Sequence, residues 1–198
     1  LTRWGGEQID NISFPLIMAY QLAENDIAFD DVTYDYINVK RSADYVARNG
    51  PATAQERWEE EAGYSPSSIA AEVAGLVCAA DLAIEEEKTA DALIWLALAD
   101  EWAVKVEDWC ATKTGTELHT NTPYYVRVTR DGNPEAGHLR TLANAGPTLD
   151  EREIIDGGFL ELTRLGIKPA GDEIIENSIT EVDNTIRVPR SLKTPGLS

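Results

Sequence analysis

The stretch of residues 50–81 constrains the fold most, because it ends one helix and begins another. Gly50-Pro51 follows Asn49, and such a pair stops a helix, since glycine suits the C-terminal turn and proline cannot continue it. Ser65-Pro66 then has the pattern of an N-cap followed by a first helical residue. The loop between these signals contains Trp58 and three consecutive glutamates. The sequence therefore predicts a helix–loop–helix unit whose loop carries carboxyl groups.

Apolar residues recur at three- and four-residue spacing along much of the chain, which predicts a mainly helical protein. Trp95, Trp102 and Trp109 repeat every seven residues, so they share one helix face, and such a stripe is typical of a core. The tail from residue 187 onwards is expected to be irregular. Helices are expected over residues 9–23, 32–48, 66–86, 88–110, 150–165 and 172–183.

Residues 112–148 differ in pattern from the rest. Residues 123–129 alternate as a strand does, and residues 131–134 have turn composition. We expect a small β-hairpin here, on a long loop between helices. The predicted class is all-α apart from this hairpin, with helix pairs that suit a ring or a bundle.

The charge of the chain argues against two classes of partner. Asp and Glu number 35 against 17 Lys and Arg, which gives a net charge of -18 over 198 residues. Such a chain repels phosphate backbones and anionic lipid, so we expect neither nucleic acid nor a membrane as partner. No apolar run is expected to reach the roughly 18 residues of a membrane span. We expect no cofactor and no metal site, and Cys78 and Cys110 lack the spacing of metal ligands.

The glutamates of the loop have two interpretations. Taken alone, Glu59, Glu60 and Glu61 have the composition of a solvated charge run. A carboxylic acid pressed against an indole, however, keeps its proton near neutrality because desolvation disfavours the carboxylate. Trp58 directly precedes the glutamates, so the loop is a candidate for general acid catalysis. The role of Glu56 stays open between orienting its neighbours and supporting the structure.

Several segments resemble one family of enzymes. The sequence Trp58-Glu59-Glu60, with its flanks, resembles the catalytic domain of glycoside hydrolase family 15, the glucoamylase and glucodextranase family, and its prokaryotic branch in particular. The resemblance implies that the chain is part of an (α/α)6 barrel, in which inner and outer helices alternate and loops at one end form the pocket. The resemblance extends over nearly the whole chain and is strongest at residues 55–60, 63–67, 150–156 and 159–162.

The resemblance also implies roles for individual residues. Glu59 matches the general acid that protonates the glycosidic oxygen, and Glu60 matches a neighbour that binds sugar hydroxyls on the leaving-group side. Trp58 matches an aromatic residue that packs beside the acid. Trp4 would contact the substrate from a second pocket segment, residues 4–10, and Gln8 would be a polar contact there.

The implied activity is that of an exo-acting, inverting α-glucosidase, which releases glucose from the non-reducing ends of α-glucans or oligosaccharides through α-1,4 or α-1,6 linkages. Glucodextranase, trehalase and glucosyl-transferring activities are alternatives within the family. An inactive or sugar-binding fragment is the alternative of another class, because the segment with the catalytic base is expected downstream of Ser198. The segment that grips the terminal glucose is expected upstream of Leu1.

Residues 1–198 are therefore expected to be the middle of a catalytic domain, which needs its remaining part as another chain or segment. Leu1 is not a start methionine, so secreted and cytoplasmic locations both stay open.

Overall fold

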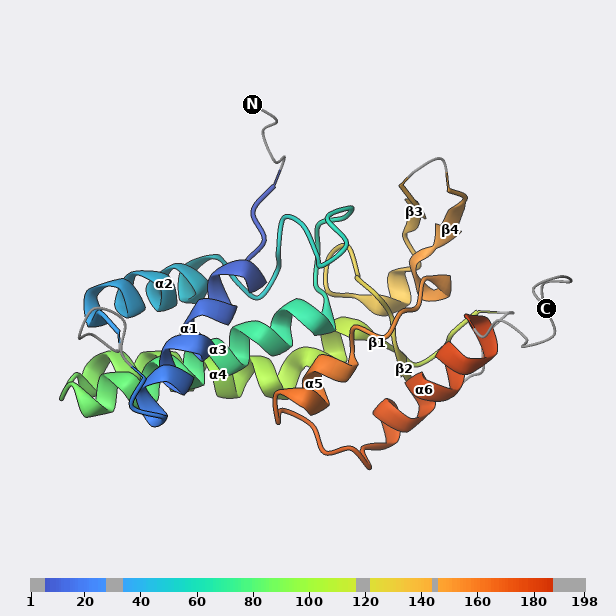
Figure 1. Cartoon of the computed structure of the whole chain (residues 1–198). Coiled ribbons are helices and arrows are strands. Elements are labelled where there is room, and N and C mark those ends of the chain that lie inside the picture. Colours follow the sequence, from blue (N-terminus) through green and yellow to red (C-terminus); the bar gives the residue numbers. More distant parts are fainter. Residues whose placement is uncertain (1–5, 28–33, 117–121, 144–145, 187–198) are drawn as a thin grey trace, which may run out of the picture.

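The computed structural model describes residues 6–27, 34–116, 122–143 and 146–186, and most of these residues are helical (Figure 1). The helices in these ranges are α1 Asp10–Glu24, α2 Tyr36–Asn49, α3 Pro66–Glu85, α4 Thr89–Cys110, α5 Leu160–Arg164 and α6 Glu173–Thr185. The strands are β1 Ala111–Thr112, β2 Tyr124–Tyr125, β3 Leu139–Thr141 and β4 Thr148–Asp150, and two short 3-10 turns are η1 Pro134–Ala136 and η2 Glu151–Glu153.

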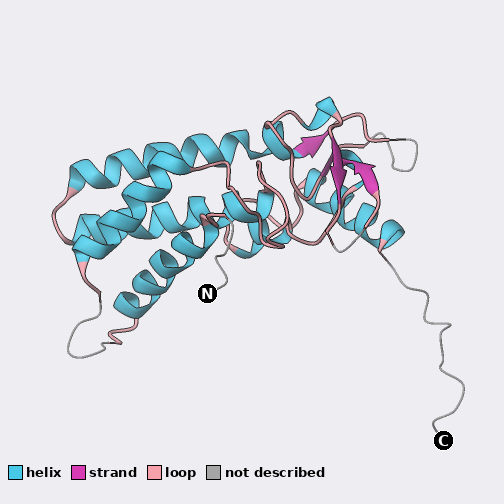
Figure 2. Ribbon diagram, turned by 90° about the horizontal axis from the view of Figure 1, so that it is seen from above, coloured by secondary structure: helices cyan, strands magenta, loops and turns pink. Residues whose placement is uncertain are grey.

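Helix α3 is the centre of the structure. It contacts α1, α2, α4 and α5, and Figure 2 shows the long helices lying side by side. Its side chains are buried almost all the way round, as expected of a core helix. Small residues allow this: at Gly75 a Cβ would lie 3.0 Å from the carbonyl oxygen of Ser13 in α1.

The sequence was expected to lack an apolar run of membrane length, and α3 corrects that expectation. By length and composition alone α3 is able to cross a membrane, with a mean hydropathy of 1.6. However, 72% of that stretch is buried inside the structure. Its apolar character is therefore accounted for by packing against the neighbouring helices.

Five of the six predicted helices, α1, α2, α3, α4 and α6, are confirmed with small shifts. α3 begins at Pro66, and α4 ends at Cys110, as the sequence indicates. α2 begins later than predicted, because Asp35 caps it by accepting a hydrogen bond from the N–H of Ile37 at 3.0 Å. Trp95 and Trp102 of the tryptophan stripe are buried in the core. The tail from residue 187 lies outside the described residues.

The helix predicted over residues 150–165 is wrong. η2, an extended stretch and the short helix α5 replace it. Asp150 accepts a hydrogen bond from the N–H of Arg152 at 2.9 Å, which starts η2. Gly157 and Gly158 then precede α5, and paired glycines disfavour a continuous helix.

A small hairpin on the loop between α4 and α5 is confirmed, but its predicted position around residues 131–134 is wrong. Residues 124–129 are all buried, and they form an enclosed segment in place of an alternating strand. β2 pairs antiparallel with β1, and η1 occupies residues 134–136. The hairpin of the structure is formed by β3 and β4, in which Arg140 pairs with Leu149. The predicted alternation failed because neighbouring segments cover this stretch on every side.

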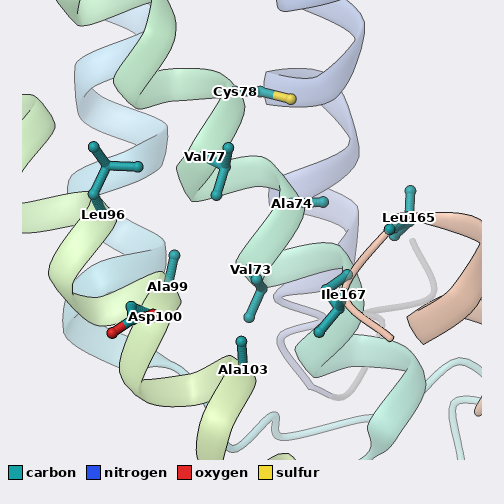
Figure 3. Close-up of a pocket in the computed structure, with 11 residues that line it drawn as sticks. Val73, Ala74, Val77, Cys78, Leu96, Ala99, Asp100, Ala103, Leu165 and Ile167 are labelled. Atoms are coloured by element: carbon teal, nitrogen blue, oxygen red, sulfur yellow. The ribbon is translucent and has the colours of Figure 1, made fainter. Parts of the chain in front are cut away.

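An apolar cavity of about 430 Å³ lies between α3, α4 and the chain that follows α5 (Figure 3). Leu93, Ile94 and Val104 of α4 are also exposed. Helices α1 to α4 lie side by side, and the described helices do not close into a ring (Figures 1 and 2). The cavity is lined by, among others, Val73, Val77, Leu96, Ala103, Leu165 and Ile167.

We expect Gly50→Ala to destabilise the protein. A Cβ at Gly50 would lie 2.6 Å from Oε2 of Glu72 and 2.7 Å from the ring of Trp102. Overpacking of this kind typically costs about 1–3 kcal/mol. Thermal unfolding measures the effect, and Gly171→Ala is the matched control because nothing lies within 4 Å of its Cβ position. Equal melting temperatures for the two variants would contradict the packing argument.

Glu72 is a carboxylic acid enclosed in the same tightly packed core. Its side chain is fully buried, and neither carboxyl oxygen has a hydrogen-bond partner among the described residues. Burial raises the pKa of Glu72 well above its usual range, and the charge of Asp10 raises it further. The folded protein therefore holds this proton more tightly than the unfolded chain does. Its contribution to stability is complete below the unfolded pKa, about 4.3, and is lost as the pH rises towards the folded pKa.

We expect Glu72→Gln to weaken the pH dependence of stability. In the interval above pH ~4.3, an acid with a raised pKa lowers the free energy of unfolding by about 1.4 kcal/mol per pH unit. The amide does not titrate, so the variant should lose less stability than the parent between pH 5 and pH 8. Urea unfolding at both pH values measures this, with the exposed Glu176→Gln as control. Identical pH profiles of the parent and Glu72→Gln would show that Glu72 does not carry the effect.

Candidate active site

The loop between α2 and α3 is closed at its base by backbone pairing. Thr53 and Gly63 exchange two hydrogen bonds of 2.9 Å, and Tyr64 and Thr129 exchange two of 2.8 and 2.9 Å. Gly63 has a φ of 143°, and a Cβ there would lie 1.9 Å from the carbonyl oxygen of Thr129, so only glycine fits. The prediction that residues 58–61 lie in a loop, off the helices, is confirmed.

Glu56 is the hub of this loop. Its N–H donates to the carbonyl oxygen of Glu61 at 2.9 Å, and its own carbonyl oxygen accepts from the N–H of Glu59 at 2.7 Å. Its Oε2 accepts from the N–H of Trp58 at 2.8 Å. The side chain is fully buried, and burial raises the pKa of Glu56, while the bond from Trp58 and the charge of Arg127 oppose the rise. The structure thus favours a role for Glu56 in shaping the loop.

Glu59 adopts a left-handed backbone conformation, with a φ of 61°. Asp26 and Glu87 also have positive φ, but they lie just beyond the ends of α1 and α3, where this conformation is common. Glu59 lies inside a loop, where an L-residue with a Cβ pays about 1–2 kcal/mol for it. Strain of this kind concentrates at functional sites.

An open, polar cavity of about 290 Å³ has Glu59 in its wall. Three segments that are distant in sequence meet there: the residues around the start of α1, the loop with the start of α3, and α5. Such a mixture of carboxyl, amide, hydroxyl and guanidinium groups with one aromatic ring suits a neutral ligand rich in hydroxyl groups. The cavity is lined by Gln8, Asp10, Asn11, Phe14, Arg57, Glu59, Ser67 and Glu161.

Gln8, one of the predicted substrate contacts, lines this cavity. Its Nε2 donates to the carbonyl oxygen of Glu56 at 3.3 Å, and its Oε1 accepts from the side-chain amide of Asn11. Asp10 beside it is almost fully buried, and burial raises the pKa of its carboxyl group. The N–H of Asn11 donates to Oδ1 of Asp10 at 2.9 Å, and this hydrogen bond opposes the rise. Trp4, the other predicted contact in this segment, lies outside the described residues.

The desolvation expected of the loop acid is not observed. Trp58 is 56% exposed, and the side chain of Glu59 is exposed as well. The indole N–H of Trp58 donates to Oδ2 of Asp156 at 2.6 Å, so a residue 98 positions away engages the ring. The carboxyl group that the loop buries is that of Glu56.

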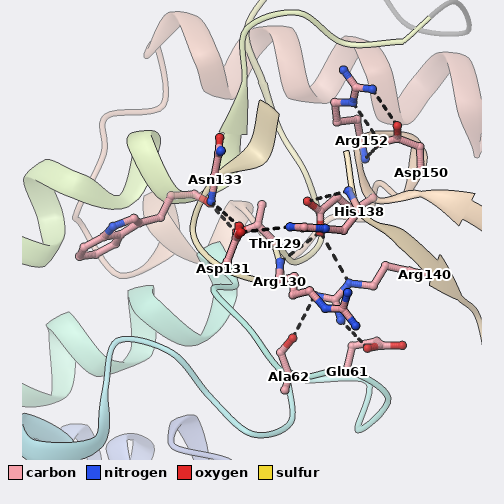
Figure 4. Close-up of polar contacts among 12 residues, drawn as sticks. Glu61, Ala62, Thr129, Arg130, Asp131, Asn133, His138, Arg140, Asp150 and Arg152 are labelled. Carbon is pink, nitrogen blue, oxygen red and sulfur yellow. Dashed lines mark hydrogen bonds and ion pairs between the residues drawn. The ribbon is translucent and has the colours of Figure 1, made fainter. Parts of the chain in front are cut away.

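Glu60 and Glu61 are both paired with buried arginines. Nη1 of Arg127 donates to Oε2 of Glu60 at 3.1 Å, and Glu60 is absent from the lining of the cavity. Glu61 is not part of a solvated charge run, the interpretation that its neighbours suggest when taken alone, because it pairs with Arg140 (Figure 4). Arg140 also donates to the carbonyl oxygen of Ala62 at 3.0 Å. The two arginines therefore connect the loop to two later parts of the chain, the enclosed segment 124–129 and strand β3.

Sequence reasoning missed four residues of this region. Asp156 and Glu161 lie in segments that carry the family resemblance, but the pattern did not assign them a role. Asp10 lies in the predicted pocket segment 4–10 but was given no role there, and Arg127 gave no signal, because its burial depends on contacts with distant segments. The described residues contain no group of three or more His, Cys, Asp or Glu side chains placed to hold a metal ion.

A model of the family described as glycosyl hydrolases family 15 matches residues 2–194. The chain belongs to this family. The mostly helical fold is thereby confirmed as part of the (α/α)6 barrel of family 15.

Relatives of known name cover most of the chain. A glucoamylase from Clostridium sp. (strain G0005) is 40% identical over 185 residues, which are 93% of this chain and 25% of the relative. The crystal structure of bacterial glucoamylase complexed with acarbose matches with a TM-score of 0.84 and 39% identity, over 92% of this chain and 26% of that chain. The chain thus spans about a quarter of the length of the proteins it matches.

The strain at Glu59 predicts that a glycine variant is more stable than an alanine variant, although glycine is usually the less stable of the two. Glu59→Gly should be more stable than Glu59→Ala by about 1 kcal/mol, because glycine adopts a positive φ without a Cβ clash. Both variants lack the carboxyl group, so the comparison isolates the backbone. Ala54→Gly is the matched control in the same loop; it should destabilise, because Ala54 does not have a positive φ. Thermal unfolding decides, and a less stable Glu59→Gly than Glu59→Ala would show that the backbone there is unstrained.

Proposed function

We propose that the protein containing this chain is an exo-acting glycosidase that releases glucose from the non-reducing ends of α-glucans. The observation that carries the proposal is the place of Glu59, which stands in the wall of a polar cavity in a strained conformation, in a family 15 chain. The names of its relatives support the substrate class, since one is a glucoamylase and the other is a bacterial glucoamylase complexed with acarbose.

In this proposal Glu59 is the general acid. Its carboxyl proton passes to the glycosidic oxygen as the bond between that oxygen and the anomeric carbon breaks. A water molecule attacks the opposite face of the sugar, activated by a second carboxylate, and the product is inverted at the anomeric carbon. The two carboxyl groups of an inverting enzyme lie about 6.5–9.5 Å apart, which leaves room for that water. We assign the second carboxylate to a part of the catalytic domain other than residues 1–198.

The other roles in this proposal are those that the resemblance to family 15 implies. Gln8 offers its amide to sugar hydroxyls from the same cavity wall. Glu60 binds hydroxyls on the leaving-group side with the part of its side chain that is exposed, 22%. Trp58 and Trp4 contribute apolar ring surface to the substrate. Trp58 has the exposed area for this contact, and its indole is oriented by Asp156.

Glu59→Gln in the complete protein should abolish turnover of maltooligosaccharides while leaving their binding largely intact. The amide keeps the shape and most hydrogen bonds, but it has no proton to give. General acid catalysis contributes on the order of 10²–10⁴-fold, so kcat should fall by about that factor. The loss should be much smaller for glucosyl fluoride, whose leaving group needs no protonation. Near-parental kcat on maltooligosaccharides would reject Glu59 as the acid and make Glu60 or Glu56 the next candidate.

The products decide between mechanisms and between classes of function. NMR detection of β-glucose as the first product from an α-glucan would support inversion, and α-glucose would contradict it. Parallel assays on isomaltooligosaccharides and trehalose define the linkage. Saturable binding of maltooligosaccharides without turnover by the complete protein would favour a sugar-binding function.

A further inference from the structure

Arg127 is a buried cation whose backbone is held firmly. It lies in the enclosed segment 124–129, and its N–H donates to the carbonyl oxygen of Ile154 at 2.9 Å. On either side, the N–H of Val126 donates to the carbonyl oxygen of Cys110 at 2.9 Å, and the backbone of Thr129 exchanges hydrogen bonds with that of Tyr64. The residue is only 8% exposed. The backbone of Arg127 is therefore fixed in position, and its side chain reaches the loop that carries Glu59.

The guanidinium of Arg127 is incompletely paired by the described residues. Nη1 donates to Oε2 of Glu60 at 3.1 Å, whereas Nε and Nη2 are buried without a hydrogen-bond partner in the described ranges. Burying a cation is costly unless its partners satisfy it, and replacing such a group by an apolar side chain is often neutral or stabilising. Stability alone is thus a weak reason for an arginine at this position.

The same guanidinium acts on two carboxyl groups of one loop. It binds Glu60 directly, and its positive charge opposes the rise in the pKa of Glu56 that burial causes. Oε1 of Glu56 is likewise buried without a partner among the described residues. Because Glu56 also organises the backbone from Trp58 to Glu61, the charge of Arg127 bears on the loop at its hub and at the residue next to Glu59.

We propose that Arg127 is a positioning residue, which fixes the carboxylate of Glu60 for sugar binding through the hydrogen bond from Nη1 and holds the loop that presents Glu59. The inference rests on the proposed function of Glu60 as a sugar contact. Arg127 itself does not line the cavity, so it acts through the loop. A guanidinium suits this task better than an ammonium, because its planar fork fixes the direction of the bond to a carboxylate.

Arg140 offers a matched control. It is also a buried arginine, 5% exposed, and it binds the same loop through Glu61 and the carbonyl oxygen of Ala62. No contact joins it to Glu60 in the described structure. Loss of either arginine removes a buried cation from beneath the loop, but only the loss of Arg127 frees Glu60.

The test is a double-mutant cycle in the complete protein, read as KM and kcat on maltooligosaccharides. Arg127→Met should raise KM about 10- to 100-fold, the range that corresponds to losing a hydrogen bond to a charged group. Glu60→Gln should raise KM to a similar extent, and the double variant should be no worse than about threefold beyond either single variant. Arg140→Met combined with Glu60→Gln should instead multiply the two single effects.

Further measurements separate positioning from structural support. Arg127→Lys should recover part of the KM loss, because it restores the charge but not the fork. Affinities for maltotetraose in the Glu59→Gln background, measured by calorimetry, repeat the cycle without turnover. If Arg127→Met does not fold, the cycle of Arg127→Lys with Glu60→Gln decides in its place.

The outcomes distinguish this inference from the proposed function. Independent, multiplying effects of Arg127 and Glu60 on affinity would overturn the positioning role, as would a lowered melting temperature with unchanged KM. Coupled effects support it. If Glu59→Gln turns over normally, the proposed acid fails, yet the affinity cycle still decides whether Arg127 positions Glu60.

Discussion

Burial of α3 is the constraint on which the rest of the structure depends. The helix is apolar on nearly every side, so it has to be enclosed, and α1, α2, α4 and α5 pack around it. Small residues such as Gly75 let α1 approach closely. The start of the same helix ends the loop of Glu59, and Ser67 lines the cavity. Packing of the core and placement of the candidate site are therefore one problem.

The loop itself is organised by charges that the core encloses. In a chain with a net charge of -18, two buried arginines meet two of the loop glutamates, and Glu56 forms the internal hydrogen bonds of the loop. Pairing compensates the cost of burying these groups. The strain at Glu59 persists because the hydrogen bonds around it hold the backbone from both sides. The strained backbone of Glu59 therefore lowers the stability of the loop, and its side chain lies in the cavity wall.

The sequence predicted well wherever a structural signal is local. The loop bounds follow from Gly50-Pro51 and Ser65-Pro66, and α3, α4 and α6 follow from spacing and capping residues. The region between β1 and α5 was predicted poorly: the expected strand over residues 123–129 is an enclosed segment, the hairpin lies further along the chain, and the helix expected over residues 150–165 is interrupted at Gly157 and Gly158. Alternation predicts a strand only when one face is solvated, and residues 124–129 are covered on both.

The sequence by itself determined the helical class, the loop of glutamates and, through Trp58-Glu59-Glu60 and its flanks, the family. Only the tertiary structure decided which carboxyl group is buried, Glu56 in place of Glu59, and which cation meets Glu60. Helix caps and turns depend on residues a few positions apart, and these can be read from the chain in order. A hydrogen bond joins Trp58 to a residue 98 positions away, and an ion pair joins Glu60 to one 67 positions away, so both contacts exist only once the chain has folded.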